Sequence, residues 1–183
     1  MIMPYSFEEF CADCRDAVAA DAGPAGRKNV VRLLENLLVD EDFVRGKMGP
    51  EQKSGRQTVY QDSETGLCVL LHRYDHEGGG TPHDHGASWA VYGQACEHTD
   101  IKLFRRLDGG AGAGGADLEV REEFRMTPGK AALFDVGTIH SINFVPGGRV
   151  VRVTGCDLDK IPKLRFDRGE GKALDWLGGP SGG

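Results

Sequence analysis

The sequence predicts an all-β domain, an antiparallel sandwich or barrel, with helices packed on its outside. Helical periodicity is confined to the first ~45 residues, where apolar side chains recur at three- and four-residue steps. From Arg56 onward, short runs rich in β-branched and aromatic residues alternate with glycine and other turn residues. The chain of 183 residues fits one domain with one core. We therefore expect a single folding unit with one active centre.

Two amphipathic helices are expected before the strands. Ser6 and Glu9 form a capping box, in which the hydroxyl and the carboxylate each accept from an amide at the start of a helix that continues to Ala20. A second helix is expected over residues 25–38, where one apolar stripe contains Val30, Val31, Leu34, Leu37 and Leu38. This stripe needs a surface to cover, so segment 1–48 is expected to pack outside the barrel as part of the same domain.

Short β-strands are expected to build the barrel within residues 49–170. The runs span residues 56–61, 66–74, 88–93, 100–106, 117–126, 131–136, 139–144 and 149–155. The stretch from Gly109 to Gly115 is expected to be a hairpin loop or flap, since it lacks the lysine and the following helix of a phosphate-binding loop. Segment 171–183 is expected to be a flexible tail.

Composition and charge exclude several classes of protein. The net charge of -6 argues against nucleic-acid binding, which needs a clustered basic surface. No apolar run approaches the ~20 residues of a membrane span, and the N-terminal residues lack the pattern of a secretory signal. Five scattered cysteines indicate free thiols in a reducing compartment, and Cys11 and Cys14, three apart on a helix, indicate a packed face. We expect a cytoplasmic protein whose partner is a small molecule.

Three histidines carry the chemistry that the sequence predicts. His83 and His85 follow a strand in the run Gly-Thr-Pro-His-Asp-His-Gly, and side chains two apart on a strand point to the same side. His140 follows the glycine turn at Gly137 in a later run. Strand pairing across a barrel would bring its imidazole to the other two, as a divalent metal site requires. The alternative is that all three are hydrogen-bonded in a polar barrel mouth.

These two segments resemble the paired motifs of the cupin superfamily over roughly residues 56–155. The first motif is matched by His83 and His85, with Gly93 closing it a few residues early. The second is matched by Gly129, Gly137, His140 and Asn143, and Asp135 stands where a proline is usual. The resemblance implies a cupin barrel, which is a double-stranded β-helix or jelly roll, with His83, His85 and His140 as the metal ligands.

The metal site is expected to lack a carboxylate. The glutamate of the first cupin motif would fall at Trp89 or Ala90, so three neutral histidines remain. The double positive charge of the ion then stays uncompensated, which favours an anionic chelating substrate. In this respect the chain resembles the thiol dioxygenase branch of the cupins, the cysteine dioxygenase-like enzymes. That resemblance implies Fe(II) as the metal, with Zn, Ni or Mn as alternatives.

The same resemblance bears on the substrate site. Thiol dioxygenases carry a Ser-x-His-x-Tyr run on a later strand, and here Val153, Gly155 and Asp157 stand at those positions. The hydroxyl network of that branch is therefore missing. Arg56 and Gln57 lie near the position where the branch anchors the substrate carboxylate, so both are candidates for substrate binding.

Three further residues are candidates because of their strands. Trp89 and Tyr92 follow the ligands on a strand expected to line the barrel, Trp89 as a substrate contact and Tyr92 as a catalytic residue; the alternative for both is packing in the core. Arg152 lies on the strand that replaces the missing run, and turned inward it would bind a carboxylate with two hydrogen bonds. The roles of the remaining histidines stay open: His72, His76 and His98.

The sequence thus predicts a mononuclear non-haem iron oxidoreductase, a thiol dioxygenase-like oxygenase that uses dioxygen and a small thiol carboxylate. One alternative is a non-catalytic, metal-dependent cupin that binds a small molecule, as the missing hydroxyl network favours. Another is a zinc hydrolase or isomerase, because three histidines with one open position also form a catalytic zinc site. Cupins often pair through outer strands, so a homodimer is expected by analogy.

Overall fold

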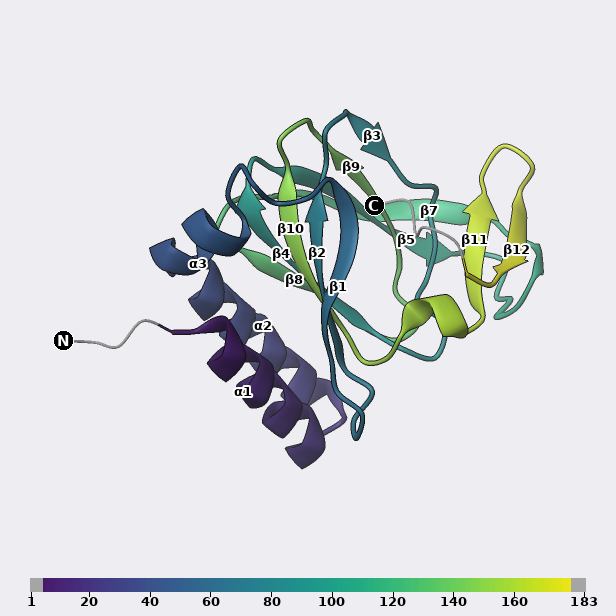
Figure 1. Ribbon diagram of the computed structural model, residues 1–183. Coiled ribbons are helices and arrows are strands. Elements are labelled where there is room, and N and C mark those ends of the chain that lie inside the picture. The colour runs from purple at the N-terminus through teal and green to yellow at the C-terminus, as the bar shows by residue number, and fades with distance from the viewer. Residues whose placement is uncertain (1–4, 179–183) are drawn as a thin grey trace.

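The computed structural model describes residues 5–178, which form a two-sheet β-structure with helices on one side (Figure 1). The first sheet has the order β1-β2-β10-β4-β8 and the second the order β3-β9-β5-β7. The strands of the first are Gly55–Gln61, Cys68–Arg73, Arg149–Thr154, Ala90–Cys96 and Ala131–Phe134. Those of the second are Gly78–Gly79, Ile139–Phe144, Thr99–Arg106 and Leu118–Met126. All pairings are antiparallel.

The strand order confirms the predicted fold class. Apart from the edge strand β1, the order β2-β10-β4-β8 faces β3-β9-β5-β7, so most successive strands cross from one sheet to the other. Eight strands in two Greek keys connected in this way form a jelly roll, the architecture to which the cupins belong. Each of the eight predicted runs contains one strand.

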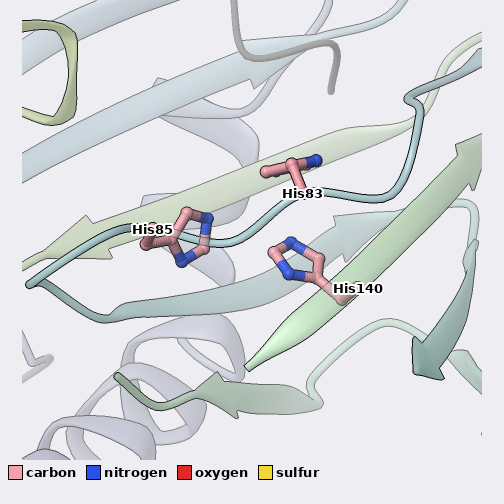
Figure 2. Close-up of side chains that lie close together, drawn as sticks. All are labelled: His83, His85 and His140. Carbon is pink, nitrogen blue, oxygen red and sulfur yellow. The ribbon is translucent and has the colours of Figure 1, made fainter. Parts of the chain in front are cut away.

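The segment between β3 and β4 carries two of the predicted ligands, and β9 carries the third (Figure 2). The interior of the barrel beside them is apolar and contains Ala90, Tyr92, Ile101, Met126, Phe134, Ile142 and Val150. The histidines therefore sit at the edge of a closed apolar core. Within the described residues, no helix is long and apolar enough to cross a membrane.

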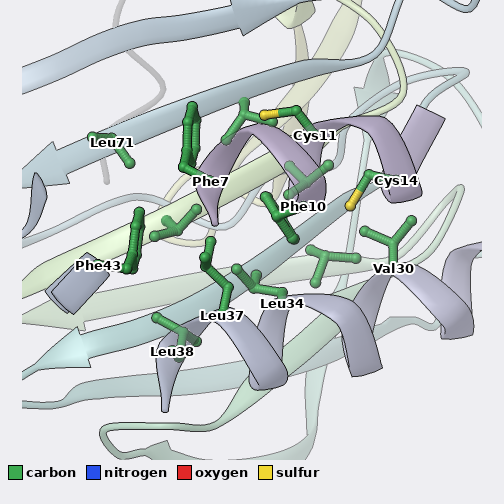
Figure 3. Packing of buried hydrophobic residues seen from close by; sticks show 14 of the residues in the cluster. Phe7, Phe10, Cys11, Cys14, Val30, Leu34, Leu37, Leu38, Phe43 and Leu71 are labelled. Atoms are coloured by element: carbon green, nitrogen blue, oxygen red, sulfur yellow. The ribbon is translucent and has the colours of Figure 1, made fainter. Parts of the chain in front are cut away.

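Three helices cover the outer face of the first sheet (Figure 1): α1 Phe7–Ala20, α2 Pro24–Leu38 and α3 Glu41–Lys47. The capping box is confirmed, since Ser6 Oγ accepts from the amide of Glu9 at 3.1 Å and the Glu9 carboxylate accepts from the amide of Ser6 at 2.9 Å. The predicted stripe of α2 packs on the sheet together with Phe10, Cys11 and Cys14 of α1 (Figure 3). Both thiols are free and buried, as expected.

Gly93 allows α2 to lie close to β4. A Cβ atom at this position would lie 2.6 Å from the side chain of Leu38 and 2.7 Å from that of Leu34. Only a residue without a side chain fits at that separation, which is shorter than any normal carbon contact. The close approach holds the helical layer against the sheet.

The chain remains ordered beyond residue 171, which corrects the flexible tail expected for 171–183. Lys172–Trp176 form β12, which pairs on one side with β11 (Lys163–Asp167) and on the other with β6 (Gly114–Gly115). Apolar side chains of the hairpin pack on the outer face of the second sheet, where Phe104, Ile139, Phe166 and Ala173 form a cluster. Residues 179–183 lie outside the described part. β6 also shows that the glycine-rich stretch 109–115 supplies a short strand to a third, small sheet of order β11-β12-β6.

Candidate metal centre

Backbone pairing places His83 beside His140. The amide of His83 donates to the carbonyl of His140 at 2.9 Å, and the amide of His140 donates to the carbonyl of His83 at 3.0 Å. The loop between β3 and β4 therefore runs as a short extra strand along β9. His85, two residues further, lies on the same side as His83, as the period of two predicts.

The three imidazoles converge on a common space (Figure 2). One ring nitrogen of each residue lies within 4.8 Å of the others. The ring centroids are 4.5 Å apart for His83 and His140, 4.8 Å for His85 and His140, and 5.6 Å for His83 and His85. Among the described residues, no carboxylate or thiol belongs to this group. The arrangement is the carboxylate-free three-histidine cluster that the sequence predicts.

The hydrogen bonding of the rings fits a metal ion. Nδ1 of His83 lies 2.9 Å from the carbonyl oxygen of Thr81. Because a carbonyl only accepts, Nδ1 carries the proton and Nε2 keeps a lone pair for a metal, the usual arrangement around ligating histidines. The Nε2 atoms of His83, His85 and His140 are buried and have no hydrogen-bond partner in the described structure. Buried polar atoms without partners are costly, and a divalent ion would satisfy all three at once.

The surroundings keep the three rings neutral. Burial lowers the pKa of His83, and it lowers the pKa values of His85 and His140 well below the ordinary histidine value. Repulsion from the neighbouring imidazoles further lowers the pKa values of His85 and His140, and the positive charge of Arg152 lowers the pKa of all three rings. Metals bind the neutral imidazole, so the site is poised for an ion at and below neutral pH.

Aromatic rings enclose the cluster. Phe134 stacks on His140 with ring centroids 4.1 Å apart, and the ring of Tyr92 lies 5.9 Å from that of His140 and 6.1 Å from that of His85. Trp176 of β12 meets His83 edge-on at 5.8 Å. Tyr92 is thus on the inner face of β4, where it also belongs to the buried core of the barrel. Trp176 was not predicted, because it lies in the segment expected to be a tail.

Two buried cations lie next to this centre. Arg152 on β10 is 1% exposed, and its guanidinium carbon lies 5.8 Å from the centre of the Tyr92 ring. Lys163 on β11 is 3% exposed; its ammonium group donates to the carbonyl of Leu158 and lies 4.8 Å from the Trp176 ring. Burial is the main cause that lowers the pKa of Lys163. Buried cations beside neutral ligands make the region attractive to anions.

Arg56 and Arg152 line a common cavity of about 130 Å³, whose other lining residues belong to β1, β2, β10 and segment 157–159. The Arg56 guanidinium forms an ion pair with Asp159 at the same cavity. Two threonines and a second aspartate also face it: Thr58, Thr154 and Asp157. The structure therefore brings Arg56 and Arg152 together, and Arg152 contacts both this cavity and the ring of Tyr92.

Gln57 and Trp89 lie on the opposite face of the sheet, so the structure does not bring these two candidates for substrate contact to the three histidines. Gln57 pairs in register with Leu71, a residue of the core beneath the helices, and its side-chain amide donates to the carbonyl of Lys53 at 2.9 Å. Trp89 is buried in the same helix-covered core. The reason is strand geometry, because neighbours such as Arg56 and Gln57 face opposite sides, as do residues three apart such as Trp89 and Tyr92.

The structure also places the other three histidines. His72 is buried on the inner face of β2, and its Nε2 has no partner in the described structure. Burial, Arg152 and Arg56 together lower the pKa of His72 well below its ordinary value. His76 is exposed and His98 is half-buried. His72 thus shares the barrel interior with Arg152, which periodicity from the sequence did not establish.

Comparison with known proteins finds similarity in structure alone. No family model and no curated protein matches the sequence. One similar structure is KdgF from Halomonas sp., 20% identical over 54% of this chain and 74% of that one, with a TM-score of 0.41. The cupin domain of Schizosaccharomyces pombe Cnp3 is 8% identical over 56% and 60%, with a TM-score of 0.43. Hydroquinone 1,2-dioxygenase PnpCD, solved with Cd²⁺ and 4-hydroxybenzonitrile, is 13% identical over 58% and 66%, also at 0.43.

Proposed function

We propose that this protein is an iron-dependent oxygenase of the thiol dioxygenase-like cupin type, acting on a small anionic thiol carboxylate with dioxygen. The observation that carries the proposal is the buried cluster of His83, His85 and His140, which has no carboxylate and lies beside the buried cations Arg152 and Lys163. Bound iron(II) would supply open coordination positions and one-electron chemistry. The chain's own residues would bind and orient the substrate.

Charge supports an anionic substrate. Three neutral ligands leave the double positive charge of an ion uncompensated, and no described carboxylate joins the cluster. Arg152 and Lys163 add two positive charges that are almost completely removed from solvent. A substrate with a thiolate and a carboxylate would bring negative charge to both places. Arg152 is the better carboxylate partner because its planar guanidinium can donate two parallel hydrogen bonds.

The position of Tyr92 supports a role in orienting the substrate. Its ring is a near neighbour of the Arg152 guanidinium and of the rings of His85 and His140. A molecule held by Arg152 at one end and by the metal at the other would pass along this ring. Tyr92, Phe134 and Trp176 would also exclude water, which strengthens every electrostatic contact in the site.

The cavity at Arg56 and Arg152 would be the path of the substrate. The ion pair between Arg56 and Asp159 lies at this cavity, and Arg152, which is more deeply buried, also lines it. An anion arriving at Arg56 would compete with Asp159 and would then meet the more deeply buried Arg152. This gives Arg56 a role in capture, whereas Gln57, on the other face, has none.

Oxygen uptake by iron-loaded protein tests the proposal. The protein would be stripped of metal, loaded anaerobically with Fe(II), and mixed with cysteine or 3-mercaptopropionate. Serine and 3-hydroxypropionate, which replace the thiol with a hydroxyl, are the matched controls. We expect one iron per chain and oxygen consumption with the thiol compounds alone. Absence of uptake with every thiol carboxylate at full iron occupancy would contradict the proposal.

A second candidate is metal-dependent binding without catalysis. Val153 and Gly155 stand where thiol dioxygenases carry hydroxyl and imidazole groups, and Val153 is buried under the helices. Thiol carboxylates that bind to the iron-loaded protein without oxygen uptake would favour this candidate. Zinc in the purified protein, together with hydrolytic or isomerase activity, would instead favour the zinc enzyme.

The homodimer also stays a prediction. β1 is an edge strand of the first sheet, so its outer side is open to strand pairing. Sedimentation analysis of the purified protein would test it. A mass of one chain at high concentration would exclude the pairing that the cupin resemblance implies.

A further inference from the structure

We infer that Asp84 is a positioning residue that ties the loop of His83 and His85 to the hairpin β11–β12 and so holds both ligands in place. The inference rests on the proposed metal site. Asp84 lies between the two ligands, and one oxygen of its carboxylate accepts two backbone hydrogen bonds. The donors are the amide of Gly86 and the amide of Leu164, each at 2.9 Å.

The loop that carries the ligands is held from both sides. On one side the backbone of His83 pairs with His140 of β9, and on the other it forms a bridge with Arg165 of β11. The amide of Asp84 donates to the carbonyl of Leu164 at 3.0 Å, and the amide of Phe166 donates to the carbonyl of Pro82 at 2.8 Å. The ligand loop is therefore a strand inserted between the second sheet and the C-terminal hairpin.

Asp84 adds to this backbone pairing a side-chain hydrogen bond between loop and hairpin, beside the edge-on contact of His83 with Trp176. Its bond to the Gly86 amide closes a tight turn directly after His85, of the kind that aspartate side chains favour. Gly86 has a φ of 59°, and a Cβ atom there would lie 2.1 Å from the carbonyl oxygen of Pro162. The turn therefore packs directly against the start of the hairpin, and a side chain does not fit at Gly86.

Among the described residues, the ring of His85 makes no hydrogen bond that would hold it in place, unlike the ring of His83, whose Nδ1 donates to the carbonyl of Thr81. Both ring nitrogens of His85 are without a hydrogen-bond partner in the described structure, so the main chain determines where the ring lies. Removing the Asp84 acceptor would leave two amides without a partner and would loosen the turn after His85. The metal would then have to order the loop on binding, and its affinity would fall.

A second consequence is coupling between the metal and the hairpin. Lys163 and Trp176 of the hairpin lie beside the centre, and Asp84 joins that hairpin to two ligands. By linkage, a metal that binds the ordered loop more tightly must also stabilise the hairpin. Hydrogen exchange of the β11 and β12 amides should therefore slow when metal binds, whereas exchange in α1 and α2 should change little.

Cobalt titration of three variants tests the inference. Co(II) alone is the probe, and its visible absorption reports both binding and coordination. We expect Asp84→Ala to weaken Co(II) binding about tenfold, which corresponds to about 1.4 kcal/mol. Asp84→Asn keeps a side-chain oxygen that can accept hydrogen bonds. We therefore expect its Co(II) affinity to stay within about twofold of wild type, well short of the tenfold loss expected for Asp84→Ala. Asp62→Ala is the matched control.

The control loses a similar carboxylate at a remote turn. Asp62 accepts from the amides of Thr65 at 2.6 Å and Glu64 at 3.2 Å in the turn between β1 and β2. Its loss should leave Co(II) affinity unchanged. Wild-type affinity in Asp84→Ala would overturn the inference, and so would an equal loss in Asp84→Asn, because the negative charge and not the acceptor would then be responsible.

Hydrogen exchange keeps the inference testable if Asp84→Ala does not fold. In wild type, saturating Co(II) should slow exchange at residues 163–166 and 172–176, and no change there would overturn the coupling. The Co(II) titration also separates failure of this inference from failure of the metal centre on which the proposed function rests. Wild type that binds no metal refutes the metal centre, whereas tight binding that is indifferent to Asp84 refutes this inference alone.

Discussion

Replacing His85 with leucine should abolish metal binding and at the same time stabilise the metal-free protein. His85 is 1% exposed, and neither ring nitrogen has a partner in the described structure. A buried polar group without a partner costs about 1–3 kcal/mol, and leucine removes both nitrogens while filling a similar volume. Allowing for imperfect packing, we expect the free energy of unfolding to rise by about 2 kcal/mol. In a chain of this size that raises the Tm by roughly 4–8 °C.

Thermal unfolding with and without metal measures this effect. Without metal, His85→Leu should unfold at a higher temperature than wild type. A metal concentration of about 100 times Kd should then stabilise wild type by about 2.7 kcal/mol and the variant not at all, so the order of the two reverses. The control is His76→Leu, at an exposed histidine outside the centre, which should leave metal stoichiometry unchanged. A metal-free His85→Leu protein that is less stable than wild type would refute the reasoning.

The pH dependence provides an independent check. The folded pKa of His85 lies well below its unfolded value, mainly because of burial, so the unfolded state binds more protons. Above the unfolded pKa of about 6.5, His85 is neutral in both states and its titration does not affect the free energy of unfolding. As pH falls below this value, the unfolded state takes up the proton first and the free energy of unfolding decreases. Metal-free wild type should therefore lose stability between about pH 6.5 and pH 5 more steeply than His85→Leu. Parallel pH profiles of the two proteins would contradict this.

Three further predictions follow from particular contacts. Arg152→Lys keeps the charge but loses the paired donors, so the KM for a thiol carboxylate should rise about tenfold at unchanged iron content, as oxygen-uptake kinetics would measure. Gly93→Ala should lower the free energy of unfolding by about 1–3 kcal/mol, since its Cβ would lie 2.6 and 2.7 Å from two leucine side chains of α2. Denaturant titration would measure this loss, and the control Gly112→Ala, with open space around it, should change the free energy of unfolding little. Co(II) should quench the fluorescence of Trp176, whose ring lies 5.8 Å from that of His83. Trp176→Phe should remove most of this quenching and leave the emission of Trp89, which is buried in the core beneath the helices.

Much of the site could be predicted because its key contacts repeat a local pattern. His83 and His85 are two apart, and the period of a strand places them on one side whatever the barrel looks like. Likewise, the apolar residues of α2 recur at helical spacing, and this pattern by itself predicts that one face of the helix is buried. Pairing of His140 with His83 did require the fold, but the resemblance in motif supplied it.

The inner and outer faces of β4 could not be read from the sequence in the same way. Six of its seven residues are buried, because helices cover one face and the barrel core the other. A strand that is buried on both sides shows no alternation of polar and apolar residues, so Trp89 and Tyr92 looked equivalent. Gln57 was misplaced for a related reason, since a polar edge strand does not reveal which side faces the barrel.

The sequence by itself determined eight of the strands, the helical cover and the common side of His83 and His85, because each depends on the period of a helix or a strand. Only the tertiary structure decided what surrounds those histidines. Lys163 and Trp176 reach the centre through the hairpin β11–β12, and Asp84 joins that hairpin to the ligand loop. These contacts link segments far apart in the chain, and closure of the barrel, not any local pattern, determines which of them meet.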